Sequence, residues 1–251
     1  MTIRLLTVIV VGLLWFCLTR EQSSLERLIF PSIEGTLLVF AAQWETWLYS
    51  AFVTLQRIVI GYVAGMCLGI VTGLSMLAHR VLGEVLDVLI EGIRPVPPIA
   101  LTPFFILWFG VGDLGQWLLI GMAVFLVFAV STAVSGKNVN QRYLRAAEAL
   151  GVTQWGRIRT VLFPAIIPDL AAAARVAAAA AFAVSIAAEY LGAQGGLGFM
   201  IRNARITLQT DAILVAIILL GFMSYLCDFG IRRAFAYWTE WVPREEQRDS
   251  M

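Results

Sequence analysis

Ionisable side chains inside apolar stretches are the residues of this sequence with the clearest potential for chemistry. Arg175 lies within the alanine-rich stretch 164–188, and Glu189 follows directly at its end. A charged side chain in a membrane segment is energetically costly, so its presence favours a function such as lining a solute pathway. The structural alternatives are a Glu189 exposed at the outer interface and an Arg175 paired inside the bundle. We expect Glu189 to line the pathway or a subunit interface and to pair with a base such as Arg202.

The same residues do not match a known enzyme pattern. Asp169, Glu189 and Asp228 are the carboxylates that a membrane-embedded enzyme could use, but no HExxH or GxSxG pattern accompanies them. His79 is the only histidine, which excludes a metal site with several histidine ligands. The only Gly-Lys pair, Gly136-Lys137, lacks the other residues of a phosphate-binding loop. We therefore predict no catalytic residue and no metal site, and we place ATP hydrolysis in another subunit.

The elements that hold these residues must be membrane helices. Of the 251 residues, 60% are hydrophobic and 14% are charged, against about 45–50% and roughly 25% in soluble domains. A spanning helix needs about 20 mostly apolar residues. We predict an all-α membrane protein with a single domain over residues 1–251 and a retained first helix rather than a cleaved signal peptide. The six predicted spans are 3–19, 58–78, 98–109 with an amphipathic lead-in from 81, 117–134, 164–188 and 212–231.

Charges in the loops predict the orientation. Residues 136–163 hold five basic residues and one acidic residue, whereas residues 20–47 hold two basic and four acidic residues. By the positive-inside rule, the first segment is cytoplasmic and the second lies outside. With six spans, both termini are then cytoplasmic. Arg232 and Arg233, just after the last span, agree with this orientation.

Glycines in the second predicted span form a regular pattern. Because they recur at every fourth residue, they share one smooth face of a helix that a neighbouring backbone can approach closely. Packing within the chain is the simplest role of this face, and it carries no information about a solute. The glycines are Gly61, Gly65, Gly69 and Gly73.

Prolines and glycines elsewhere predict irregular backbone at membrane depth. Pro97, Pro98 and Pro103 interrupt the third span, and such backbone persists only where protein or a water-filled cavity surrounds it. This favours either a broken helix beside a pathway or an ordinary kink at the interface. The stretch 195–198 could turn the chain back toward the pathway, or it could be a plain external loop. The residues that we expect to line or gate the pathway are Pro97, Pro98, Arg175, Glu189, Gly196 and Gly198.

The loop 136–163 predicts a short helix that lies across the cytoplasmic membrane face. Residues 141–150 are good helix formers, and Gly151 is placed to end the helix in a left-handed conformation. Thr153 can cap the next helix, and Pro164 can open the fifth span. The small alanines of the short helix are potential contact points, so we predict that it docks in a groove of a partner protein.

The loop also carries a motif. It reads Arg145-Ala146-Ala147-Glu148-Ala149-Leu150-Gly151 and, after nine residues, Val161-Leu162-Phe163-Pro164. This resembles the cytoplasmic motif of ABC importer permeases, which is Glu-Ala-Ala, three residues, Gly, nine residues and Ile-x-Leu-Pro. The chain departs from it at Arg145, where the family has Glu, so a salt bridge made by that Glu is not expected. The coupling residues that the resemblance implies are Arg145, Ala146, Ala147, Glu148, Gly151 and Pro164.

Further stretches resemble the taurine, sulfonate and nitrate branch of these permeases, over about residues 45–240 in all. Arg145 and Thr210-Asp211 resemble taurine permeases most. The resemblance implies the type I importer permease fold and a pathway for a small anionic solute, with taurine or another sulfonate first. Nitrate, another small anion and an aromatic acid are the alternatives, and an ion-coupled carrier is the rival class. The stretches are residues 94–100, 106–112, 188–189 and 196–199.

The resemblance also implies partners. Two permease copies, expected to be a homodimer, would form the pathway in the lipid bilayer of the bacterial inner membrane. Two cytoplasmic ATPase subunits would use ATP and Mg²⁺ and dock on the loop 136–163, and a periplasmic or lipoprotein binding protein would deliver the solute. This chain would bind no cofactor itself. The absence of a basic tract from the sequence argues against a nucleic-acid partner.

Overall fold

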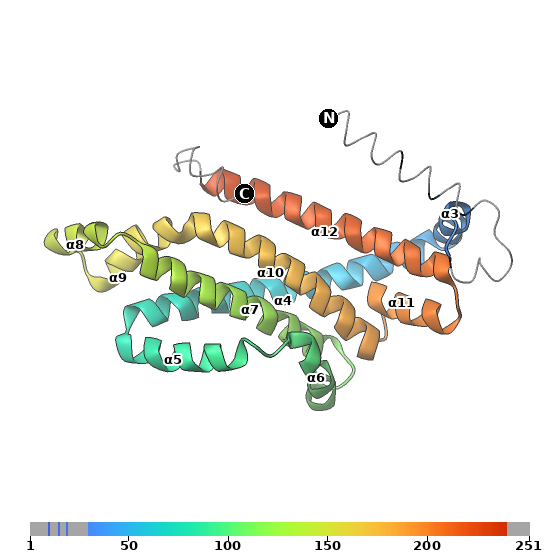
Figure 1. The fold of residues 1–251 in the computed structure, drawn as a ribbon, viewed down its shortest axis with the longest axis horizontal. Coiled ribbons are helices and arrows are strands. Elements are labelled where there is room, and N and C mark those ends of the chain that lie inside the picture. The colour runs from blue at the N-terminus through green and yellow to red at the C-terminus, as the bar shows by residue number, and fades with distance from the viewer. Residues whose placement is uncertain (1–9, 11–14, 16–18, 20–29, 240–251) are drawn as a thin grey trace.

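The computed structural model describes Val10, Trp15, Thr19 and residues 30–239, and within this part all regular elements are helices. The long helices run along one common direction. Short helices lie at the two ends of the molecule, and others lie along the side of the bundle (Figure 1). Each of the long helices is long and apolar enough to cross a membrane. They are α4 (Trp44–Ala78), α7 (Asp113–Asn138), α10 (Phe163–Gly192) and α12 (Thr210–Trp238).

A broken span lies between α4 and α7. Helix α5 (Arg80–Ile93) is followed by the 3₁₀ turn η1 (Pro98–Leu101) and by α6 (Thr102–Phe109), and the two halves are bent by 80° at the break. Pro97 precedes η1 and Pro98 begins it, which confirms the predicted interruption of the third span. With this bent pair, the described residues offer up to five spans. The first predicted span, 3–19, lies outside the described residues except for Val10, Trp15 and Thr19, so the six-span count and the cytoplasmic termini stay predictions.

Two stretches predicted as loops are helical. Helix α3 (Ile33–Ala42) lies within the segment 20–47, and Ser32 caps it by accepting a hydrogen bond from the Gly35 N–H. Helix α4 then begins at Trp44, so the predicted start of the second span at Ile58 is wrong. Helix α11 (Leu197–Ile206) follows the glycine-rich turn and packs against α10 and α12. The chain therefore turns back onto the bundle after α10 instead of forming a plain external loop.

The fifth span begins earlier than predicted. After α8 (Gln141–Ala149), the helix α9 (Gln154–Arg157) continues through the π-helical turn η2 (Ile158–Leu162) into α10. Pro164 lies in the first turn of α10, as predicted, but the helical path already begins at Gln154. In the π turn the Phe163 N–H donates to the Ile158 carbonyl, five residues back. This local change of hydrogen-bond register accommodates a proline that cannot donate.

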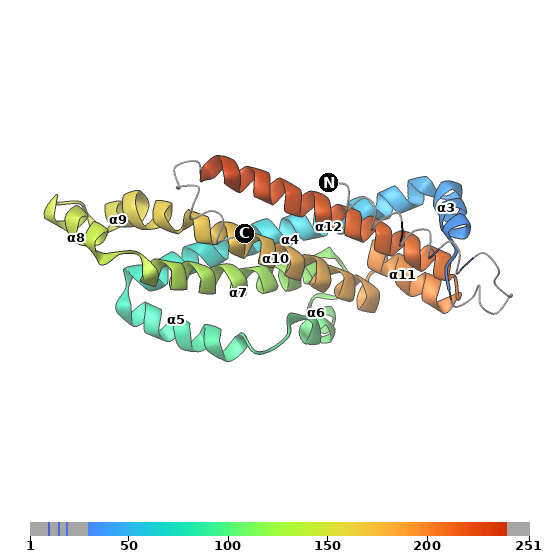
Figure 2. The same ribbon diagram turned by 45° about the horizontal axis from the view of Figure 1, so that its top comes forward.

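The core of the bundle is formed by α4, α7 and α10, which lie side by side in Figures 1 and 2. The glycine face of α4 lies against α7: a Cβ on Gly73 would come within 2.5 Å of the Thr132 Cβ, and one on Gly65 would collide with the Gly121 carbonyl oxygen. The alanine-rich face of α10 packs against both α7 and α4. Only small residues permit this close approach of helices.

Candidate functional site

A buried cluster of charged groups joins α4, α7 and α10 at the end of the bundle where α11 lies. Arg57 of α4 is 8% exposed and Glu189 of α10 is 0% exposed. The Arg57 Nη1 donates to the Glu189 Oε1 at 3.0 Å and to the Gly195 carbonyl oxygen at 2.7 Å. The Arg57 Nε donates to the Asp113 Oδ1 at 2.8 Å. A buried guanidinium with two carboxylate partners is compensated in charge and in hydrogen bonding.

The second carboxylate oxygen of Glu189 holds the turn before α11. It accepts hydrogen bonds from the Thr54 hydroxyl and from the Gly198 N–H, each at 2.9 Å. The Thr54 hydroxyl in turn accepts from the Leu197 N–H at 2.8 Å. Two N–H groups in the first turn of α11 are thereby directed at the cluster, and the positive end of that helix lies beside the carboxylate. Glu189 is therefore a structural centre that fixes how the chain turns.

Glycine is required in that turn. Gly196 has φ +101°, and a Cβ there would lie 2.5 Å from the Glu189 carboxyl carbon and both its oxygens. A Cβ on Gly198 would lie 2.6 Å from the Ile186 carbonyl oxygen. Both glycines allow the backbone to close over the carboxylate.

The expected partner of Glu189 is wrong. Arg202 instead donates to the Ala193 carbonyl oxygen at 3.2 Å, and its guanidinium carbon lies 4.9 Å from the centre of the Phe199 ring. The base that pairs with Glu189 is Arg57, which lies just before the predicted second span and which we expected to be a packing or interface anchor. Full burial also excludes the alternative in which the Glu189 carboxylate is exposed at the outer interface.

Arg175 has a partner inside the bundle. Its Nε lies 2.8 Å from the Asp228 Oδ1, and the Nη2 of Arg232 lies 3.1 Å from the other Asp228 oxygen. The Arg175 and Asp228 side chains are 37% and 32% exposed. This pair joins α10 to α12, which is the structural alternative considered for Arg175.

The predicted cytoplasmic loop forms two short helices at one end of the molecule (Figure 1). Gly151 has φ +75°, its N–H donates to the Glu148 carbonyl at 2.9 Å, and the Val152 N–H donates to the Ala147 carbonyl at 3.0 Å. This is the Schellman arrangement that ends a helix. Thr153 caps α9 by accepting from the Gly156 N–H at 3.2 Å. Both predicted caps are confirmed.

The loop presents a surface that its own chain does not cover. Within the motif, Ala147 is buried, whereas Arg145, Ala146 and Glu148 are exposed. The carboxylate of Glu148 lies 3.2 Å from Arg157 in α9, which ties the two short helices together. The side chains of Leu150 and Trp155 are 83% and 71% exposed. Large apolar side chains exposed together at the tip of a protein are typical of a contact surface.

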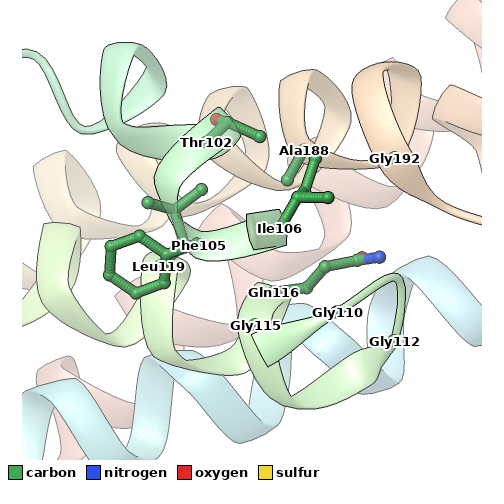
Figure 3. A pocket seen from close by; sticks show the side chains of 10 residues that line it. All are labelled: Thr102, Phe105, Ile106, Gly110, Gly112, Gly115, Gln116, Leu119, Ala188 and Gly192. Atoms are coloured by element: carbon green, nitrogen blue, oxygen red, sulfur yellow. The ribbon is translucent and has the colours of Figure 1, made fainter. Parts of the chain in front are cut away.

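Two hollows border the broken span. The smaller one, shown in Figure 3, is a crevice of about 10 Å³ between α6, the start of α7 and the end of α10, with Thr102, Gln116 and Gly192 among its walls. It is too small for a solute. The larger one, of about 480 Å³, is lined by Pro97 and Pro98 and by residues of α7 and α10.

Known proteins similar to this chain include bacterial transport permeases. The taurine transport system permease protein TauC of Escherichia coli (strain K12) is 33% identical over 188 residues, which are 75% of this chain and 68% of TauC. The nitrate import permease protein NrtB of Synechococcus elongatus is 30% identical over 179 residues, 70% of this chain and 64% of NrtB. The fold is that of a chain of the MetNI methionine ABC transporter in an inward-facing conformation, with a TM-score of 0.64 at 18% identity, over 78% of this chain and 98% of that chain.

A family model covers most of the chain as well. Residues 65–237 match the model of the binding-protein-dependent transport system inner membrane component. The matched region contains α7, α10 and α12, the broken span and the loop with α8 and α9. The chain therefore belongs to the family of binding-protein-dependent inner membrane components, the permease subunits of ABC importers.

Proposed function

We propose that this permease passes a small organic sulfonate, taurine or a close relative, across the inner membrane. The observation that carries the proposal is the 33% identity with TauC over 188 residues. The stretches that resemble this branch include residues 94–98, beside the larger hollow, and residues 196–198, in the turn held by Glu189. The resemblance thus extends to the parts of the bundle that a solute pathway would involve.

The chain works as one subunit of a larger importer. As a member of its family, it acts with separate ATPase subunits and a binding protein, and it is not itself an enzyme. We propose that two copies of this chain form a homodimeric pathway. Two ATPase subunits, which bind the ATP and Mg²⁺, would dock on α8 and the exposed apolar tip around Leu150 and Trp155. This docking would transmit their movement to α10, because α9 and η2 continue into that helix.

Of the residues expected to line or gate the pathway, Arg175 pairs with Asp228, and the others fall into two groups. Pro97 and Pro98 line the larger hollow and would contact passing solute or water. Glu189, Gly196 and Gly198 instead hold the turn at the end of α10. We propose that this second group acts by fixing that turn, since its carboxylate has no free surface toward a solute.

Uptake by the reconstituted importer tests the proposal. The permease, its ATPase and its binding protein are assembled in liposomes with ATP inside, and labelled taurine is added with the binding protein outside. We expect accumulation that requires ATP and the binding protein and that unlabelled alkanesulfonates suppress. Competition by nitrate but not by sulfonates would instead assign nitrate, as the similarity to NrtB allows. Accumulation by the permease alone would contradict the importer mechanism and indicate an ion-coupled carrier.

A further inference from the structure

The larger hollow lies at mid-depth in the bundle. Its walls come from the connection between α5 and η1, from α7 and from α10. On α7, which runs from Asp113 to Asn138, the lining residues lie between Ala123 and Ser131. Figure 2 shows the connection opposite the central part of α7. The hollow is therefore near the middle of the membrane and not at either surface.

Arg94 is the one charged residue among those that line this hollow. It ends α5, immediately before the irregular backbone of the break, and it is exposed. Several other arginines in these helices have a carboxylate partner within 3.1 Å, namely Arg57, Arg80, Arg175 and Arg232. Within residues 30–239, no ion pair joins Arg94 to another side chain, and the exposed Glu91 one turn earlier is not bonded to it.

An unpaired guanidinium at this depth needs a polar surrounding. A charged side chain at the centre of a bilayer is costly and is found where it faces a water-filled cavity or a partner. Broken backbone at this depth has the same requirement. Both features meet at the α5–η1 connection, so this hollow is the water-accessible part of the bundle.

We infer that Arg94 binds the sulfonate group of the solute midway across the membrane; this inference rests on the proposed function. The planar guanidinium donates two parallel hydrogen bonds, which fit the oxygens of an oxyanion. Ser131 adds a hydroxyl from the α7 wall of the hollow, and Val127 and Val176 provide apolar contact for a short alkyl chain. A single cation in a hollow of about 480 Å³ leaves room for water, so the anion is held weakly enough to leave again.

Charge removal at Arg94 tests the inference in the assembled importer. We expect Arg94→Gln to lower sulfonate uptake by about ten-fold, the effect of losing one charge-assisted contact. ATPase assembly and stimulation of ATP hydrolysis by the binding protein should persist. Arg94→Lys should keep a substantial part of the uptake. The matched control is Arg80→Gln at the other end of α5, where the side chain is 92% exposed and pairs with Glu84; its uptake should be unchanged.

A chemical rescue shows whether lost uptake results from the missing charge or from altered folding. In a variant without the native cysteines, Arg94→Cys should have low uptake, and a thiol reagent that attaches an aminoethyl group should restore it. A reagent that attaches a neutral methyl group should not. Equal rescue by both reagents would overturn the inference, because it would show that charge is not needed.

Two further results would also overturn it, and they are distinguishable from failure of the proposed function. Normal sulfonate uptake by Arg94→Gln would remove Arg94 from the pathway while leaving sulfonate transport established. Loss of ATPase co-purification in that variant would assign Arg94 to assembly. If the wild-type importer accumulates no sulfonate at all, the proposed function fails, and the inference fails with it.

Discussion

At the scale of single residues, the charged cluster around Glu189 is the most constrained feature of the described chain. One carboxylate receives an ion pair, a hydroxyl and a backbone N–H while its side chain is fully buried. Removing one partner of a buried pair leaves the other charge uncompensated, which destabilises far more than the loss of a surface pair. Asp113 moderates this effect here, because it gives Arg57 a second, half-exposed carboxylate.

Glu189→Gln should therefore destabilise the permease without preventing its insertion. We expect a loss of about 2–3 kcal/mol, below the roughly 3–5 kcal/mol typical of a broken buried pair, because Asp113 still compensates Arg57. Transport should fall because the turn before α11 loosens. Thermal unfolding of the detergent-purified importer and sulfonate uptake measure the two effects.

The controls for this prediction distinguish the loss of a buried ion pair from the loss of any single carboxylate. Glu84→Gln removes the carboxylate of an exposed pair with Arg80 and should change stability by less than about 0.5 kcal/mol. The double variant Arg57→Gln with Glu189→Gln should lose less than the sum of the two single variants, since the removed groups are bonded to each other. Wild-type melting and uptake by Glu189→Gln would show that the cluster has no part in the fold or the mechanism.

At the scale of helices, the sequence predicts the apolar spans well and their ends poorly. Hydropathy predicts that the second span starts after Arg57, because an isolated guanidinium is unfavourable in lipid. The helix nevertheless continues back to Trp44, because Arg57 meets carboxylates that lie 56 and 132 residues away in the chain. The same pairing extends α10 past Glu189 to Gly192. Because these partners are distant in the chain, a pattern of neighbouring residues cannot predict them.

The features of the candidate site also differ in how well the sequence predicts them. The caps at Gly151 and Thr153 were predictable because a helix end depends on the residues within one turn of it. The partner of Glu189 was not, because Arg57 and Arg202 are equally plausible bases until the helices are placed. Arg94 carried no signal of its own beyond the neighbouring prolines; its importance comes from its depth in the bundle and from the absence of an ion-pair partner within the described residues.

The cap at Gly151 leads to a prediction about coupling. Gly151→Val should lower transport strongly while ATP hydrolysis continues, because a β-branched residue does not tolerate φ +75° and α8 would lose its stop. The exposed tip around Leu150 would then be misoriented relative to the ATPase. The ratio of solute transported to ATP hydrolysed is the measurement. Gly221→Val is the control, since a Cβ at Gly221 in α12 meets open space, and it should keep the wild-type ratio.

A well-assembled Gly151→Val importer with an unchanged ratio would contradict this coupling role. The cap would then determine the shape of the loop without contributing to coupling. Loss of the ATPase from the purified complex would be the stronger form of the predicted defect, since it places the error at the docking contact itself.

At the scale of the whole molecule, short helices lie at both ends of the bundle. Helices α8 and α9 lie at one end, and α3 and α11 lie at the other, with the long helices between them (Figures 1 and 2). The end with α8 carries most of the loop arginines, and the segment 20–47 carries more acidic than basic residues. The positive-inside rule places the segment with more basic residues in the cytoplasm. Only one orientation satisfies it, with α8 and α9 inside and the segment 20–47 outside.

That orientation can be tested with single cysteines in a cysteine-free variant. Tyr143 in α8 is 65% exposed, and Gln43 between α3 and α4 is exposed at the opposite end of the molecule. An impermeant thiol reagent added to intact cells should label Gln43→Cys and leave Tyr143→Cys unlabelled, because only the end with α3 faces outward. After the membrane is permeabilised, both variants should react, which shows that each thiol is accessible. The reverse pattern in intact cells would invert the permease, would move α8 away from the compartment that holds the ATPase, and would thereby contradict the docking of ATPase subunits on this loop.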